Sequence, residues 1–101
     1  MPQVTYSEQT SLDFARIAVF CDSVAPNLKD KAILAILRGI EVLKTYPEIA
    51  KVFPEAPYQH MRELQIPFGK SAYLVLYEYE KSLDEVIIAS IRHSKESGYK
   101  I

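Results

Sequence analysis

Cysteine is almost absent from this sequence of 101 residues, in which Cys21 is the only one. A disulfide within the chain is therefore excluded, and the composition fits a reducing compartment as well as any other. No apolar run approaches the roughly 20 residues that span a bilayer, and the opening MPQVTYSEQT lacks the basic and apolar regions of a signal peptide. The sequence therefore predicts a cytoplasmic protein without a membrane partner.

An excess of charge of either sign is also lacking, because 12 Lys and Arg face 13 Asp and Glu and the formal net charge is -1. Nucleic-acid binding depends on cations that neutralise phosphates, so it would need a local basic patch here. The two histidines, His60 and His93, lie far apart without a cysteine pair or a close carboxylate, which is a poor pattern for a metal site. We expect no metal and no other cofactor.

Repeats, low-complexity tracts and linkers rich in Gly or Ser are missing, and the three glycines stand near apparent element boundaries. Hydrophobic residues make up 49% of the chain, which suffices for one core. We therefore predict a single domain over residues 1–101.

The N-terminal part predicts a short strand followed by a helix. Val4 and Tyr6 have strand character, and Ser7 or Thr10 can cap the helix that follows. Pro26 ends this helix because proline lacks an amide proton and clashes with the preceding turn. The apolar residues at helical spacing are Phe14, Ile17, Ala18, Cys21 and Ala25. Cys21 thus lies on the buried face, as a packing residue and not a nucleophile.

A second helix is predicted directly after Pro26, so that the two form an antiparallel hairpin. Asn27 is expected to cap it, with Asp30 in its first turn near the positive helix end. Pro47 bounds it. Its apolar stripe consists of Ile33, Ile36, Leu37, Ile40 and Leu43.

The C-terminal half predicts an antiparallel meander after a proline-rich loop over residues 47–60. Its three strands are MRELQI from Met61, AYLVLYEY from Ala72 and EVIIASIRH from Glu85, joined by the short links PFGKS and EKSLD. The predicted fold is therefore α+β, in the order β-α-α-β-β-β, with the helical hairpin on one face of the sheet and the first strand at an edge.

The stretch RELQIPFGKSAYLVLYEYEKSLDEVIIASIRHSKESGY resembles the C-terminal half of RelE/ParE toxins of type II toxin-antitoxin modules. It has an Arg-x-Leu strand, a glycine turn, a Tyr-x-x-x-Tyr strand and a closing strand that ends in basic or His residues and an aromatic. The resemblance implies a toxin that binds a cognate antitoxin and meets DNA only through it. It implies either cleavage of mRNA on the ribosome or poisoning of DNA gyrase, and the shared fold does not decide between them.

Metal-independent RNA cleavage needs groups that remove one proton, supply another and neutralise charge on the phosphate. The resemblance implies Arg62 for the phosphate, His93 as the near-neutral titrator and Tyr99 as an aromatic that stacks on a base. The candidate catalytic residues are Arg62, Arg92, His93 and Tyr99, and the candidate substrate-binding residues are Lys70, Lys95 and Tyr73.

Each candidate also has a purely structural alternative. Arg62 could pair with a carboxylate such as Glu78, and Tyr99 could pack against the edge of the domain. Tyr73, Tyr77 and Tyr79 share one strand face and could be either a stacking platform or the rim of the core. Strict alternation places Arg92 with Val86, Ile88 and Ser90, and His93 on the opposite face with Ile87, Ala89 and Ile91.

Three functions remain open: a ribosome-dependent endoribonuclease, a non-enzymatic gyrase binder, and an inactive relative that keeps its antitoxin groove. The near-neutral charge favours the gyrase binder over the endoribonuclease. The antitoxin is expected to add a strand or lay a helix across exposed apolar surface. Ile49, Val52 and Phe53 are the candidates for part of that groove, although they could also close the core under the loop.

Overall fold

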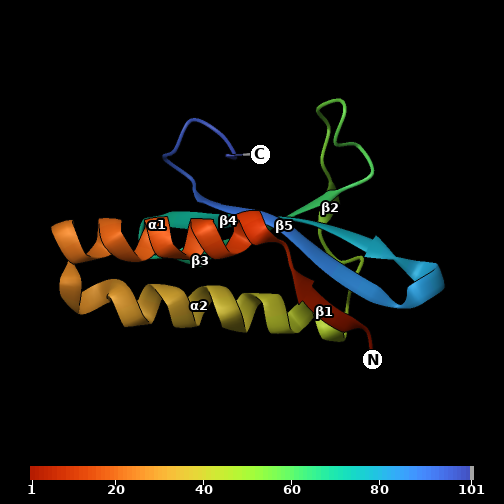
Figure 1. Cartoon of the computed structure of the whole chain (residues 1–101), viewed down its shortest axis with the longest axis horizontal. Helices are drawn as coiled ribbons and strands as arrows, with labels where there is room; N and C mark the ends of the chain where they lie inside the picture. The colour runs from red at the N-terminus through yellow and green to blue at the C-terminus, as the bar shows by residue number, and fades with distance from the viewer. Residues whose placement is uncertain (101) are drawn as a thin grey trace.

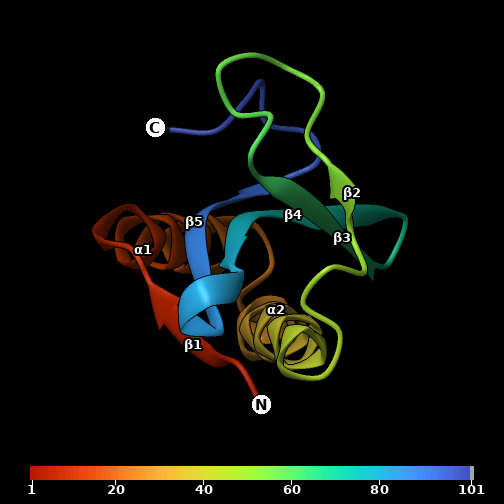
Figure 2. The same cartoon turned by 90° about the vertical axis from the view of Figure 1, so that its right-hand side faces the viewer.

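The computed structural model describes residues 1–100 and shows a curved five-stranded sheet, with the second helix packed under one face and the first helix alongside the last strand (Figures 1 and 2). The elements are β1 (Gln3–Tyr6), α1 (Glu8–Val24), η1 (Pro26–Leu28), α2 (Lys29–Glu41), η2 (Val42–Lys44), β2 (Lys51–Val52), β3 (Arg62–Phe68), β4 (Ser71–Glu80), η3 (Lys81–Leu83) and β5 (Glu85–His93). The predicted α+β fold is confirmed. Neither α1 nor α2, nor any other helix within residues 1–100, is long and apolar enough to cross a membrane.

The strand order in the sheet is β1-β5-β4-β3-β2. Strands β3, β4 and β5 form the predicted antiparallel meander, and β1 pairs in parallel with β5 at one edge. The segment predicted as a loop contains the two-residue strand β2, which pairs with the start of β3 at the other edge. Two residues are too short to give an alternation signal in the sequence.

The start of α1 follows the predicted capping. The Ser7 hydroxyl accepts a hydrogen bond from the Thr10 amide at 3.1 Å and donates one to the Ala89 carbonyl at 2.7 Å. The cap therefore satisfies a free amide of the first turn and also fixes α1 to β5.

The predicted Asn27 cap of α2 is wrong. Residues 26–28 form a 3-10 turn that leads directly into α2, so the residue before α2 is Leu28, which already has helical backbone angles and no side-chain cap. Pro26 at the first position of the turn fixes its own φ and favours this entry. No extended residue is left at which a capping side chain could act.

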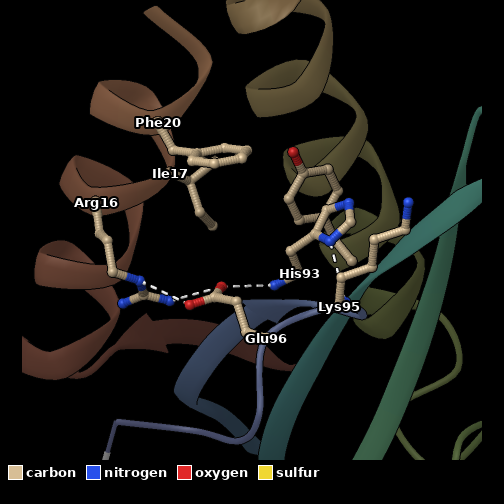
Figure 3. A pocket seen from close by; sticks show the side chains of 7 residues that line it. Arg16, Ile17, Phe20, His93, Lys95 and Glu96 are labelled. Atoms are coloured by element: carbon tan, nitrogen blue, oxygen red, sulfur yellow. Dashed lines mark hydrogen bonds and ion pairs between the residues drawn. The ribbon is translucent and has the colours of Figure 1, made fainter. Parts of the chain in front are cut away.

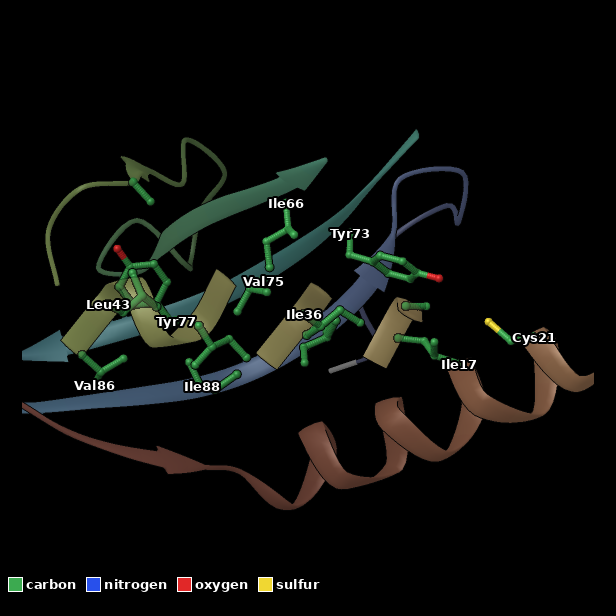
Figure 4. Packing of buried hydrophobic residues seen from close by; sticks show 14 residues of the cluster. Ile17, Cys21, Ile36, Leu43, Ile66, Tyr73, Val75, Tyr77, Val86 and Ile88 are labelled. Carbon is green, nitrogen blue, oxygen red and sulfur yellow. The ribbon is translucent and has the colours of Figure 1, made fainter. Parts of the chain in front are cut away.

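The core lies between α2 and the sheet (Figure 4). Ile36, Ile40 and Leu43 are fully buried against the inner side of β4 and β5. Leu37, which was predicted in the same stripe, is 38% exposed because it falls one position round the helix from Ile36. The stripe is therefore narrower than the sequence pattern indicates.

Gly39 allows α2 to approach β3 closely. A Cβ atom at this position would lie 2.6 Å from Cγ1 of the buried Ile66. We expect Gly39→Val to lower the free energy of unfolding by about 1–3 kcal/mol through overpacking, measured by urea denaturation. Gly98→Val is the matched control, since a Cβ there has no neighbour within 4 Å. Equal midpoints for the two variants would contradict this tight contact.

A β-bulge in β5 changes which residues face the helices. Tyr77 pairs with Ile88 and Leu76 with Ser90, so Ala89 has no partner on β4. Val86 and Ile88 therefore share the helix-covered face with Ile91 and His93, although strict alternation assigned them to opposite faces. The predicted alternation is wrong before the bulge, because the extra residue shifts the register by one.

Candidate functional site

Arg62 begins β3 on the helix-covered face, where it pairs with Tyr77. Its Nη1 donates hydrogen bonds to the carbonyl oxygens of Glu48 and Ala50 at 3.1 and 2.7 Å, and its Nη2 lies 3.4 Å from the Glu48 carboxylate. The alternative partner Glu78 instead lies 3.6 Å from the His60 ring. The guanidinium therefore fastens the chain that leads into β2.

Arg92 lies on the opposite face of the sheet, which α2 does not cover and which is here called the open face. There it pairs with Leu74 of β4. Its Nη1 donates to the Glu96 carbonyl at 2.7 Å, with longer bonds to the carbonyls of His93 and Ser94. Its guanidinium carbon lies 5.1 Å from the centre of the Tyr99 ring. Arg92 thus organises the C-terminal segment, residues 94–100, by binding its backbone and stacking on its aromatic ring.

Tyr99 bridges β3 and β5 across the open face. Its hydroxyl donates to the Glu63 carboxylate at 2.5 Å, and its ring meets Phe53 edge-on at 6.2 Å between centroids. Burial and the adjacent Glu63 carboxylate raise the pKa of the Tyr99 hydroxyl far above its usual value. The phenol therefore stays protonated and is committed to an internal contact.

His93 ends β5 on the helix-covered face. Its Nδ1 accepts the Lys95 amide at 3.1 Å, and its Nε2 lies 3.1 Å from the Ser71 hydroxyl. Because Nδ1 accepts a hydrogen bond, the neutral ring carries its proton on Nε2 and donates to Ser71. The ring also packs against Tyr73 in a T-shaped arrangement with 5.2 Å between centroids, so both of its nitrogens have hydrogen-bond partners and the ring has an aromatic neighbour.

The structure does not bring the four predicted catalytic side chains to one surface. Arg92 and Tyr99 meet on the open face, whereas Arg62 and His93 lie on the helix-covered face at opposite ends of β4, beside Tyr77 and Tyr73 respectively. Of the predicted substrate-binding residues, Lys70 is exposed at the β3–β4 turn, Lys95 is exposed in the C-terminal segment, and Tyr73 is buried in the core.

A buried carboxylate that the sequence analysis missed lies between α1 and β5. Asp13 is fully buried and accepts hydrogen bonds from the Ser90 hydroxyl at 2.7 Å and the Ile91 amide at 2.9 Å. It also accepts from Gln9 and forms an ion pair with Arg16. Burial opposes ionisation, but these donors together hold the pKa of Asp13 below its usual value.

Arg16 connects this carboxylate to the C-terminal segment. Its Nε and Nη2 both lie 3.1 Å from the Glu96 carboxylate, which also accepts the His93 amide at 2.9 Å. Burial opposes ionisation of Glu96, but Arg16 and the His93 amide lower its pKa. The charged chain Asp13, Arg16 and Glu96 therefore fixes α1, β5 and the C-terminal segment to one another.

Two hollows are formed near these groups. The first, of about 310 Å³, opens between α1 and the end of β5 and is lined mainly by apolar carbon (Figure 3). The second, of about 540 Å³, runs along β2 and β3 and contains all three residues of the predicted antitoxin groove. Ile49 and Val52 are more than half exposed there, whereas Phe53 is half-buried against Tyr99. Within residues 1–100, no three His, Cys, Asp or Glu side chains converge as metal ligands.

Comparison with known proteins relates this chain to a protein family. A sequence model of the family described as "ParE toxin of type II toxin-antitoxin system, parDE" matches residues 4–98. The chain belongs to this family. It is also 31% identical over 96 residues to Toxin RelE3 of Caulobacter vibrioides, covering 95% of this chain and 98% of that protein. The predicted membership of the RelE/ParE superfamily of type II toxins is thereby confirmed.

Two solved structures share the ParE toxin fold of this chain. A chain of the chromosomal ParDE system from P. aeruginosa superposes with a TM-score of 0.74 at 17% identity, over 92% of this chain and 96% of that one. A chain of the intact E. coli RelBE toxin-antitoxin complex gives a TM-score of 0.60 at 10% identity, over 95% of this chain and 100% of that one. At these identities the likeness concerns the fold alone.

Proposed function

We propose that this ParE-family toxin inhibits growth by binding DNA gyrase, without cleaving RNA, and that a cognate antitoxin neutralises it. The observation that carries the proposal is the placement of the four candidate catalytic residues on two faces of the sheet, each bound to other parts of the chain.

Cleavage of RNA by attack of a 2′-hydroxyl needs a base, an acid and a cation within reach of one phosphate. Arg62 and Arg92 donate to backbone carbonyls, and the Tyr99 hydroxyl donates to Glu63. His93 could act as a base only if it gave up its bond to the Lys95 amide or to Ser71. A nuclease mechanism would therefore have to dismantle contacts that hold the fold.

The charge distribution supports the same conclusion. RNA affinity grows with the number of phosphates that cations neutralise, and the net charge of this chain is -1. On the open face, Glu63 lies beside Tyr99 and would repel a phosphate at that point. Recognition of a protein surface has no such requirement, so the gyrase alternative fits this surface better.

The antitoxin is supported by the two structural neighbours, one from a ParDE system and one from a RelBE toxin-antitoxin complex. The groove along β2 offers an edge strand on which an antitoxin strand could pair, with exposed Val52 on this strand and exposed Ile49 just before it. Double replacement of Ile49 and Val52 with Ser should weaken antitoxin binding, and unchanged affinity would exclude this edge.

The function is tested with the purified toxin in two assays run side by side. We expect inhibition of gyrase supercoiling that the antitoxin reverses, and no new RNA ends when the toxin is added to a translating extract. Toxin-dependent cleavage of mRNA at sense codons, with supercoiling untouched at high toxin excess, would overturn the proposal in favour of a ribosome-dependent endoribonuclease. No effect in either assay and no growth arrest on expression would favour an inactive relative.

Arg62→Ala separates the two mechanisms. Because the Arg62 guanidinium is held by the carbonyl oxygens of Glu48 and Ala50, we expect the folded variant to inhibit supercoiling within about twofold of the wild type. Tyr77→Phe is the matched control, since it releases the same segment by removing the bond to the Pro47 carbonyl. Loss of activity in Arg62→Ala alone, with an unchanged urea midpoint, would instead identify Arg62 as a functional residue.

A further inference from the structure

We propose that this toxin contacts gyrase through the tip of the β4–β5 hairpin, residues 80–85, here called the hairpin tip, with the side chain of Leu83 as the central contact. The inference rests on the proposed function and names the surface of the toxin that carries it. The hairpin tip stands at one end of the long axis of the molecule, opposite to the turn between α1 and α2 (Figure 1). Its turn residues, 81–84, are all exposed and therefore accessible to a large partner.

The hairpin tip is held in one conformation by hydrogen bonds on both sides of its turn. The amide and the hydroxyl of Ser82 donate to the Glu80 carboxylate at 3.4 and 2.8 Å. The Asp84 carboxylate accepts the Tyr79 hydroxyl at 2.7 Å, and the Asp84 carbonyl accepts the Gln3 amide of β1 at 3.0 Å. A surface that is ordered before binding loses little conformational entropy when the complex forms, which favours affinity.

Leu83 is an apolar side chain at a position where the fold does not bury it. Turns usually carry Gly, Pro, Asn, Asp or Ser, whereas Leu83 is 71% exposed and lies outside the core. A single exposed leucine is ordinary on a flat protein surface. On an ordered, projecting turn, however, it can enter a pocket of a partner, and its burial there would remove apolar surface from water.

The charges beside Leu83 indicate the sign of the partner surface. Glu80 and Glu85 pair directly opposite each other at the end of the hairpin, and neither forms an ion pair within residues 1–100. The Lys81 ammonium lies 3.4 Å from the Glu48 carboxylate instead. Like charges directly opposite on neighbouring strands repel each other. A cation of the partner beside the two carboxylates would offset this repulsion.

A cationic surface is what an enzyme that handles DNA offers. Proteins that bind duplex DNA neutralise its phosphates with Lys and Arg, so gyrase complements the charge around Leu83. A second copy of this chain does not, because a two-fold pairing through the hairpin tip would bring Glu80 and Glu85 of both copies together. The groove proposed for the antitoxin lies along β2, which β3 separates from the hairpin.

The experiment measures inhibition of gyrase supercoiling by the full-length toxin, and binding of the toxin to purified gyrase by calorimetry. We expect Leu83→Asp to weaken both by about 10- to 100-fold, the effect of losing one buried leucine contact. Val19→Asp is the matched control, because Val19 is 70% exposed on α1. It should stay within about twofold of the wild type. Urea midpoints establish that both variants are folded.

Glu85→Lys separates binding from stability. The change turns the repulsive pair with Glu80 into an attractive one, so the urea midpoint should rise or stay unchanged. Binding to gyrase should nevertheless weaken by about 3- to 10-fold and lose part of its salt dependence. Glu55→Lys, at an exposed loop residue, is the control for the same change of charge. Equal gyrase affinities for Glu85→Lys and Glu55→Lys would overturn the cationic partner surface.

The outcomes separate this inference from the proposed function. If the wild type inhibits gyrase and folded Leu83→Asp does so within about twofold of it, the hairpin tip is not the contact, while the gyrase proposal stands. If the wild type neither binds nor inhibits gyrase, the proposed function fails and this inference fails with it. If Leu83→Asp inhibits gyrase normally but is no longer neutralised by the antitoxin, the hairpin tip belongs to the antitoxin, which also overturns the inference.

Discussion

Asp13→Ala is expected to lower the free energy of unfolding by about 3–5 kcal/mol, the usual cost of removing one partner from a buried charge pair. The change leaves the Ser90 hydroxyl and the Ile91 amide without their acceptor inside the protein, and it removes the buried partner of Arg16. Urea denaturation followed by far-UV circular dichroism measures the loss. A loss of this size is a large part of the total free energy of unfolding of a small protein.

The control for this variant is Asp22→Ala. Asp22 pairs with Lys29 at 3.1 Å, but both side chains are exposed, so the cost should stay within about 0.5 kcal/mol. Similar losses for the two variants would show that Asp13 does not hold α1 on β5.

The same carboxylate predicts how stability depends on pH. The pKa of Asp13 is lowered in the folded chain, so its contribution is fully present above the unfolded pKa and is lost as the pH falls through the folded one. The wild type should therefore lose stability on acidification below about pH 4, and Asp13→Ala should lose less over this range. Parallel curves for the two proteins would contradict the lowered pKa.

Tyr77→Ala is the second substitution with a large expected effect, about 3–5 kcal/mol for the loss of a fully buried aromatic side chain. Tyr77→Phe should cost only about 1 kcal/mol, because it removes the 2.8 Å hydrogen bond to the Pro47 carbonyl and leaves the ring in place. Thermal and urea unfolding measure both, and Tyr46→Ala, at a 60% exposed residue, is the control.

Combining Tyr77→Phe with Arg62→Ala tests whether the two side chains act on one segment. They bind the carbonyls of Pro47, Glu48 and Ala50, so their effects should couple by about 0.5 kcal/mol or more in a double-mutant cycle. Strict additivity would mean that Arg62 does not hold this segment. Its guanidinium would then be available for a contact outside the fold.

The fold could be predicted because its strongest signals are local. Ser7 before a helical pattern and the three C-terminal strand patterns each indicate their element without knowledge of the rest of the chain. The cap of α2 could not be predicted, since Pro26 begins a 3-10 turn that shares its composition with an ordinary interhelical loop. Strand β2 exists only through its pairing with β3, which no local pattern records.

The site was harder to predict because it depends on register and on charge burial. The bulge at Ala89 cannot be recognised from the sequence, because it lies in a run of β-branched and small residues. It nevertheless decides which residues of β5 face the helices. Asp13 stands between Thr10 and Ile17 at the spacing of a buried helix face. An acidic residue at such a position could have indicated a buried hydrogen-bond network. Its partners could not be predicted, because Ser90 and Ile91 are distant in the sequence.

The parallel pairing of β1 with β5 has a consequence for how the chain is made. Residues 3–6 are synthesised some eighty residues before their hydrogen-bonding partners, which begin at Glu85. Closing a contact across some eighty residues slows folding, because the entropy of the whole intervening loop is lost at once. A nascent chain that lacks β5 therefore cannot complete this sheet, because β5 is the strand that joins β1 to the meander.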